Sequence, residues 1–170
     1  DALIGVSMTG IGSAAVLQLD MQEGANIVKS ENARVSKLIG INRAARTTCV
    51  KPAGTTSLVL GTSSGIHAWH NDYYIRRLRV GKNEAIYKYL KQNHTELVDD
   101  EYFRPHDTAV IEIPQSSPKG SILRTESAFD LMERVKRVAT EWVSAGHKGG
   151  SNTHNVSATI SLKKEDWDKA

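Results

Sequence analysis

The sequence predicts an α/β fold, because segments with helical spacing alternate with segments rich in β-forming residues. The strongest helical pattern spans 127–145, where apolar residues recur every three or four positions. Two β-rich segments, 46–51 and 108–114, each run into a proline, which is a residue that commonly ends a strand.

The N-terminal part of the chain, residues 1–46, is predicted to be mainly helical. Ser30 is a candidate N-cap, and Val35, Leu38 and Ile39 follow it at the spacing of one helix face. We therefore expect a helix that begins near Ser30.

The middle of the chain predicts a strand, a short helix and a second strand. Residues 73–80 alternate in a two-residue period, and 83–93 carry apolar residues on one helical face. Segment 108–114 is apolar enough to expect burial on both of its faces.

The C-terminal third predicts one long helix and one strand. Ser127 and Asp130 have the spacing of a capping box at the start of helix 127–145, and Gly146 can end it. Residues 155–162 alternate apolar and hydroxyl side chains, which indicates a strand with one solvated face.

Composition and charge narrow the class of protein. The 170 residues, 39% apolar and 24% charged, fit one compact domain, so we expect residues 1–170 to form a single domain. No apolar window is long enough for a membrane span, and no leader pattern opens the chain, which favours a cytoplasmic protein without a membrane partner. A net charge of +3 suits small anions and is too weak to predict nucleic-acid binding. The single cysteine excludes an internal disulfide and fits a reducing compartment.

Three weaker patterns have simpler explanations. "TGIGSAA" together with Tyr87 and Lys91 resembles a dehydrogenase, but the third glycine of a dinucleotide-binding loop is absent. His67 and His70 lie three residues apart, yet no third metal ligand can be identified, so no metal site is predicted. Cys49 is more simply a small buried side chain than a reactive thiol.

The segment "KPAGTTSLVLGTSSGIH" (51–67) carries the clearest chemical signal. A strand that ends at Pro52 and a turn at Gly54 lead into a predicted helix start at 54–57. The amides of a helix start are unpaired and attract anions, so we expect those of Gly54, Thr55 and Thr56 to converge on one point. This pattern predicts a phosphate-binding turn.

"RTTCVKPAGTTSLVLGTSSGIH" followed by "YYIRR" closely resembles the C-terminal catalytic region of ribonucleotide reductases of the adenosylcobalamin-dependent class. In that family such a turn binds the phosphates of the ribonucleotide substrate. By resemblance the substrate-phosphate cradle comprises Pro52, Ala53, Gly54, Thr55 and Thr56, with Ala53 standing where the family commonly has Ser.

The same resemblance assigns Gly65, Ile66 and His67 to the wall of the active site, with Ala68 replacing a common Pro. The N-terminal "IGVSMTGIG" and the C-terminal "NVSATISL" are also similar to the family. The resemblance implies the C-terminal part of a ten-stranded α/β barrel. Because such a barrel is only partly encoded here, we expect an apolar face that the chain does not cover itself.

The family's radical-carrying cysteine, its "NPCGE"-like motif and its reducing cysteine pair have no counterpart in this sequence, so no catalytic residue is assigned. The resemblance therefore implies a partial enzyme that is inactive alone and needs the N-terminal remainder of the reductase or a split-gene partner. Adenosylcobalamin and a thioredoxin-like reductant are implied for the complete enzyme, with no ligand to cobalt identifiable here. The alternative is a stand-alone nucleotide- or phosphate-binding module without catalysis.

Overall fold

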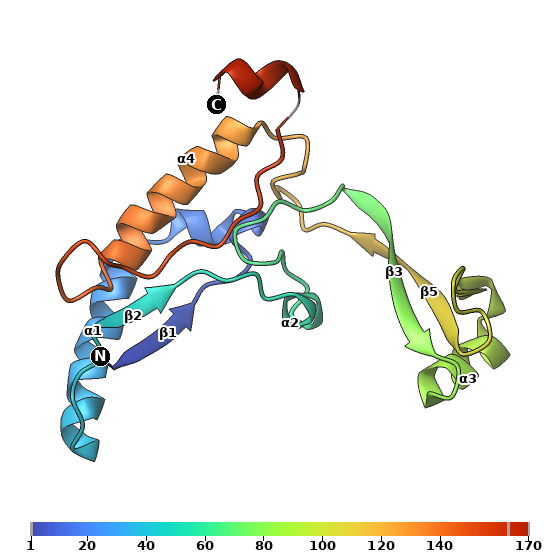
Figure 1. The fold of residues 1–170 in the computed structure, drawn as a ribbon, viewed down its shortest axis with the longest axis horizontal. Helices are drawn as coiled ribbons and strands as arrows, with labels where there is room; N and C mark the ends of the chain where they lie inside the picture. Colours follow the sequence, from blue (N-terminus) through green and yellow to red (C-terminus); the bar gives the residue numbers. More distant parts are fainter. Residues whose placement is uncertain (1, 163, 170) are drawn as a thin grey trace. The chain divides into compact units, whose positions relative to one another are not determined.

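The computed structural model describes residues 2–162 and 164–169, and the chain divides into two compact units. The first unit comprises 1–70 and 118–170, and the second comprises 71–117. Figure 1 traces the chain from its N-terminus in blue to its C-terminus in red. Within the described ranges, no helix combines the length and the apolar character needed to cross a membrane.

The first unit begins with a strand that the sequence patterns did not predict. β1 (Leu3–Ser7) pairs in parallel with β2 (Arg46–Cys49), and the connection between them contains a long helix (Figure 1). The prediction of a mainly helical N-terminus is therefore wrong over β1. Five residues interrupted by Gly5 give a weak periodic signal, and the strand forms by pairing with a segment about forty residues away in the sequence.

The connecting helix α1 (Met21–Ile39) starts earlier than predicted. The side chain of Asp20 accepts a hydrogen bond of 2.9 Å from the amide of Glu23, which is an N-cap interaction. Ser30 lies inside the helix, so its predicted capping role is wrong. The helix ends at Gly40, whose φ of 71° favours glycine. Two 3-10 turns, η1 (Ile11–Ser13) and η2 (Ala15–Gln18), precede it.

Helix α4 (Ala128–Val138) confirms the predicted capping box. The Ser127 hydroxyl accepts from the amide of Asp130, and the Asp130 carboxylate accepts from the amide of Ser127. The helix continues as a π-helical segment, η4 (Ala139–Ser144), so the predicted helix of 127–145 is confirmed with a change of winding.

The core of the first unit lies where α1, β2 and η4 pack together. Its buried apolar residues are Ile11, Met21, Ala25, Val50, Ile66, Leu131, Val138, Trp142 and Val143. Two buried threonines of β2 satisfy carbonyl groups near the end of η4. Thr48 Oγ1 donates to the carbonyl of Trp142 at 2.7 Å, and Thr47 Oγ1 donates to that of Gly146 at 2.7 Å. These bonds fix β2 against the helical layer.

The predicted strand at 155–162 is not formed as a ladder. A single parallel bridge joins Val50 and Val156, with the amide of Ser157 donating to the carbonyl of Val50 at 3.1 Å. Beyond Val50 the neighbouring chain enters the turn at Pro52, which has no amide hydrogen, so the pairing stops. The C-terminal segment ends in a 3-10 helix, η5 (Lys164–Lys169).

The predicted uncovered apolar face is found on β1. Leu3, Ile4 and Val6 have exposed fractions of 51%, 43% and 41%. Successive residues of a strand point to opposite faces. Both faces of β1 therefore carry exposed apolar side chains within the described residues.

The second unit is a three-stranded antiparallel sheet with one main helix. β3 (Tyr73–Gly81), β5 (Thr108–Ser116) and β4 (Val98–Asp100) pair in the order β3-β5-β4. The helix α3 (Ala85–Asn93) and the 3-10 turn η3 (Thr95–Leu97) connect β3 to β4. The predicted elements at 73–80, 83–93 and 108–114 are thus confirmed, with small shifts at their ends.

The expectation that segment 108–114 is buried on both faces is wrong. Ala109 and Ile111 are buried, whereas the residues between and after them are only partly buried or exposed. In an antiparallel sheet one face can remain solvated, and this is the arrangement of β5. Pro114 also lies within the strand, paired with Ile75 on the neighbouring β3.

Candidate functional site

The predicted phosphate-binding turn leads from β2 into a short helix. Gly54 adopts φ 54°, and α2 (Thr55–Val59) begins at the next residue. The hydroxyl of Ser57 donates to the carbonyl of Gly54 at 2.6 Å and closes the turn. The predicted helix start is therefore confirmed. The structure describes the backbone of Thr55, whereas its side chain lies outside what is described.

The expected convergence of three amides in this turn is corrected by the hydrogen bonds. The amide of Gly54 donates to the hydroxyl of Ser64 at 3.1 Å, and the amide of Thr56 donates to the carbonyl of Ala53 at 3.2 Å. Two of the three amides thus already have acceptors within the chain. The acceptor of Gly54 is a side-chain hydroxyl, which another oxygen can replace.

The predicted wall, Gly65–His67, is held by the loop that precedes η1. Thr9 Oγ1 donates to the carbonyl of Ser63 at 3.1 Å and accepts from the amide of Gly65 at 3.0 Å. The amide of Ile11 donates to the carbonyl of Gly65 at 3.0 Å. Because the two backbone groups of Gly65 are bonded to Thr9 and to Ile11, the first residue of η1, the predicted wall has a fixed position in the first unit.

Glycine is required where the wall meets the turn. Gly65 has φ 56°, and a Cβ atom at this position would lie 2.8 Å from the carbonyl oxygen of Lys51 and 3.2 Å from Cα of Pro52. No side chain fits at that separation without backbone movement. The predicted wall and the predicted phosphate-binding turn are therefore in direct contact, as their assignment to one site requires.

His67 links the wall to the C-terminal segment. Its Nε2 accepts a hydrogen bond of 2.9 Å from the amide of Thr159, and its Nδ1 lies 3.2 Å from the carbonyl of Ser64. An amide can only donate, so Nε2 carries the lone pair and Nδ1 the hydrogen. The contacts thus select the neutral Nδ1–H tautomer and leave neither ring nitrogen available as a metal ligand. Beside it, Ile66 is fully buried.

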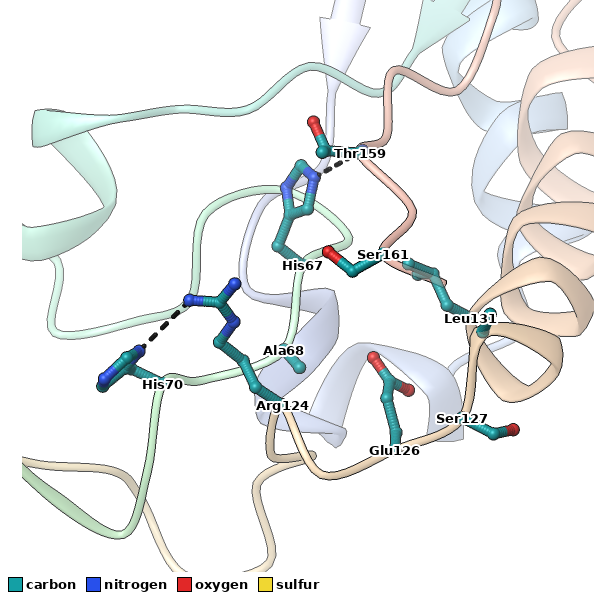
Figure 2. Close-up of a pocket in the computed structure, with 10 residues that line it drawn as sticks. His67, Ala68, His70, Arg124, Glu126, Ser127, Leu131, Thr159 and Ser161 are labelled. Atoms are coloured by element: carbon teal, nitrogen blue, oxygen red, sulfur yellow. Dashed lines mark hydrogen bonds between the residues drawn. The ribbon is translucent and has the colours of Figure 1, made fainter. Parts of the chain in front are cut away.

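An open pocket of about 380 Å³ lies beside His67 (Figure 2). At one edge the guanidinium of Arg124 approaches Nδ1 of His70 at 3.3 Å. Thr159 and Ser161 contribute hydroxyl groups from the C-terminal segment. The pocket therefore lies next to the predicted wall, and polar groups and the Arg124 cation line it.

A buried ion pair holds one side of this pocket. Glu126 accepts two hydrogen bonds from Arg134, at 2.6 and 2.7 Å, and the two side chains are 13% and 7% exposed. This geometry is bidentate and charge-assisted, which orients the carboxylate. Glu126 consequently acts as a fixed part of the pocket frame.

The other sequence candidates lie elsewhere. Cys49 is partly buried on β2, in register with Ser7 of β1. Tyr87 and Lys91 belong to α3 in the second unit. Among the described residues, no group of three or more His, Cys, Asp or Glu side chains is placed to hold a metal ion. The histidine His154 bonds the carbonyl of Thr48 through Nδ1.

Sequence reasoning missed the residues that hold the wall. Thr9 and Ser13 lie in "MTGIGS", a segment whose most distinctive pattern is its glycine spacing. Ser13 Oγ accepts from Trp69 Nε1 at 2.8 Å and lies 3.2 Å from Thr62 Oγ1. The similarity of "IGVSMTGIG" to the reductases was the available signal, but it named no partner for these side chains.

Comparisons with known proteins find relatives of this chain. No protein-family profile matches the chain. The adenosylcobalamin-dependent ribonucleoside-triphosphate reductase of Euglena gracilis is 29% identical over 171 residues, covering 95% of this chain and 22% of that protein. The enzyme of the same name from Lactobacillus delbrueckii subsp. bulgaricus is 32% identical over 139 residues, covering 79% of this chain and 17% of that protein.

The chain is a homologue of adenosylcobalamin-dependent ribonucleotide reductases. A putative ribonucleoside-diphosphate reductase large subunit of Frog virus 3 is also similar, at 28% identity over 82% of this chain. The chain spans 22% of the Euglena reductase, about a fifth of its length.

The fold agrees with the same family. A crystal structure of a B12-dependent, class II ribonucleotide reductase matches 98% of this chain with a TM-score of 0.74 and 20% identity. The match covers 27% of the chain in that crystal structure. The α/β fold described here is thus that of one part of a class II reductase.

Proposed function

We propose that this chain is part of a ribonucleotide reductase that converts ribonucleotides to deoxyribonucleotides by radical chemistry. Its contribution is the substrate-phosphate cradle, Pro52–Thr56, and the active-site wall, Gly65–His67. The observation that supports this most directly is the contact between the two segments, where Gly65 lies against Lys51 and Pro52 and Gly54 bonds to Ser64.

In this proposal a phosphate oxygen takes the place of the Ser64 hydroxyl as acceptor for the amide of Gly54. The exchange replaces a neutral acceptor by a charged one, and charge-assisted hydrogen bonds are the stronger kind. The exposed Thr56 adds a hydroxyl donor at the start of α2. The positive φ of Gly54 orients the turn for this contact.

The wall is proposed to bound the substrate rather than to react with it. Both ring nitrogens of His67 already have backbone partners, which makes the imidazole a rigid surface. The hydroxyls and the Arg124 cation of the adjoining pocket lie next to that surface. A polar, hydroxyl-bearing substrate is the class of molecule that such a lining accommodates.

The radical cysteine, the acid–base glutamate and the reducing cysteine pair are proposed to come from the N-terminal remainder of the reductase or from a split-gene partner. A thioredoxin-like protein is the proposed reductant of the complete enzyme. Adenosylcobalamin, which the relatives' names specify, would supply the initial radical. No described residue is assigned as a ligand to the cobalt of this cofactor, so no step is assigned to this chain through it.

The test is to assemble this chain with the missing reductase portion and to measure deoxyribonucleotide formation. Replacing Thr55 and Thr56 by Ala should weaken apparent substrate affinity by about two to four decades if the losses add, since each hydrogen bond to a charged group contributes roughly 1.5–3 kcal/mol. The matched control is Thr140→Ala, an exposed threonine whose hydroxyl bonds within its own helix.

The chain alone, given ribonucleotide, adenosylcobalamin and a dithiol, should form no deoxyribonucleotide. Turnover by the chain alone would refute the assignment of the chemistry to another portion. Nucleotide binding without any gain of turnover in the assembly would instead favour the stand-alone binding module. Unchanged affinity in the Thr55 and Thr56 variant would refute the cradle.

A further inference from the structure

A second pocket, of about 230 Å³, lies at the N-terminal end of β2. Its charged lining residues are Lys29 of α1, Arg43 of the loop before β2, and Lys148, which follows η4. Ala44, Thr47 and Gly146 form a buried floor. Among the lining residues that the structure describes, none is a carboxylate.

Hydrogen bonds between three chain segments build this pocket. The side-chain amide of Asn32 donates to the carbonyl of Ala44 at 3.1 Å and accepts from its amide at 3.3 Å, which ties the loop to α1. The amide of Thr47 donates to the carbonyl of Gly146 at 3.2 Å, and that of Lys148 donates to the carbonyl of Ala45 at 3.0 Å. The three chain segments that carry the cations are therefore tied to one another through their backbones.

The charges in this pocket are not neutralised by described carboxylates. One turn further along α1, Arg34 forms a bidentate pair with Glu31 at 2.6 and 2.9 Å. Within the described ranges, no such ion pair involves Lys29, Arg43 or Lys148. Like charges held in one pocket repel each other, and a bound anion converts that repulsion into attraction.

We propose that this pocket binds the phosphate group of a small molecule. The planar guanidinium of Arg43 can present two donors to one phosphate, and the two lysines supply compact charges beside it. The volume is below the roughly 300–1,000 Å³ of pockets that enclose drug-sized ligands. It suits a phosphate, or a short chain of phosphates, whose remainder extends into solvent.

This site is separate from the proposed substrate cradle. The pocket lies at the N-terminal end of β2, whereas the proposed cradle follows the C-terminal end of the same strand. Phosphate bound here is therefore a second ligand. Its binding does not depend on whether the chain belongs to an active reductase.

The experiment is a titration of the chain, labelled with ¹⁵N, with inorganic phosphate and with tripolyphosphate at constant ionic strength. Amide resonances of Ala44, Thr47 and Lys148 should shift and saturate. The double variant Arg43→Gln and Lys148→Gln should weaken the fitted affinity by at least about ten-fold, the loss expected for a single bond to a charged group. The control, Lys88→Gln with Lys136→Gln, removes the same charge from exposed positions outside the pocket.

Amide shifts that saturate in the parent chain, and that are weakened in the double variant but not in the control variant, would establish the site. The proposal is overturned if these amides do not shift, if the double variant binds as the parent does, or if acetate binds equally well at the same ionic strength. Amide shifts confined to residues 53–56 would support the cradle and overturn this site. Should the double variant not fold, Lys29→Gln alone must weaken binding, and unchanged affinity would be decisive against the proposal.

Discussion

The imidazole of His67 accepts a hydrogen bond of 2.9 Å from the amide of Thr159, across 92 residues of sequence. The contact attaches the C-terminal segment to the wall of the candidate site (Figure 2). It also satisfies a backbone amide that a strand at 155–162 would have paired with a neighbouring strand. The side chain of His67 therefore has a structural function in addition to its proposed place beside the substrate.

Replacing His67 by Ala should release the segment around Thr159. Because Thr159 is exposed, water can replace the lost acceptor, and the free energy of unfolding should fall by only about 0.5–1.5 kcal/mol. Hydrogen exchange of the Thr159 amide should become faster, as measured by NMR. His106→Ala in the second unit is the control, and unchanged exchange at Thr159 in the His67 variant would contradict the contact.

Gly65→Ala should destabilise the chain strongly. The substitution combines a positive φ of 56° with a Cβ position 2.8 Å from the Lys51 carbonyl oxygen, and we expect a loss of roughly 2–5 kcal/mol in the free energy of unfolding. Gly120→Ala is the matched control, since Gly120 has φ 82° with nothing within 4 Å of its Cβ position. Its loss should be about 1–2 kcal/mol. Equal losses in a urea titration would show that the wall does not press against the turn.

Elements encoded by neighbouring residues could be predicted from the sequence. The capping box of α4 depends on Ser127 and Asp130, which lie three residues apart, and the start of α2 depends on the adjacent Gly54. In both cases the residues that cause the structure lie within a few positions of one another in the sequence. The cradle and wall residues were assigned by their resemblance to the family within one stretch of seventeen residues, 51–67, and that assignment stays a prediction.

Elements that depend on distant partners could not be predicted. β1 is a strand only because β2 lies alongside it, and the segment after Val156 loses its pairing because Pro52 turns the neighbouring chain away. The amide of Gly54 was expected to be unpaired, yet Ser64, ten residues further on, accepts from it. Local periodicity contains no information on these partners.

The capping box of α4 should give the chain an acid-sensitive contribution to stability. Hydrogen bonds from the Ser127 hydroxyl and amide hold the pKa of Asp130 below its ordinary value. A carboxylate whose folded-state pKa is lowered stabilises the fold above its unfolded-state pKa. That contribution is lost as the pH falls through the folded-state pKa, so the loss should appear below about pH 4.

Thermal unfolding midpoints measured between pH 7 and pH 2 check this prediction. The parent should lose more stability on acidification than Asp130→Asn, which cannot ionise at this position. Glu133→Gln removes a carboxylate from the same helix without touching the cap and should retain the parent's acid sensitivity. Parallel pH profiles for the parent and Asp130→Asn would exclude the cap as a source of the effect.

Replacing Cys49 tests whether this chain supplies a catalytic thiol or only binds the substrate. Its side chain is partly buried on β2, and a Cβ atom on Gly5 would lie 3.1 Å from its sulfur. The contact that involves the core is made by its backbone, since Trp142 Nε1 donates to the Cys49 carbonyl at 3.0 Å.

Cys49→Ser keeps this bond and nearly the same volume, so the reductase assembled with its missing portion should keep its turnover and its electron delivery nearly intact. The measurement is the rate of deoxyribonucleotide formation with a dithiol reductant, with the Thr55 and Thr56 double variant assayed beside it. Loss of turnover in Cys49→Ser, together with normal substrate affinity in the double variant, would reverse the proposed roles and make this thiol the catalytic group of the chain.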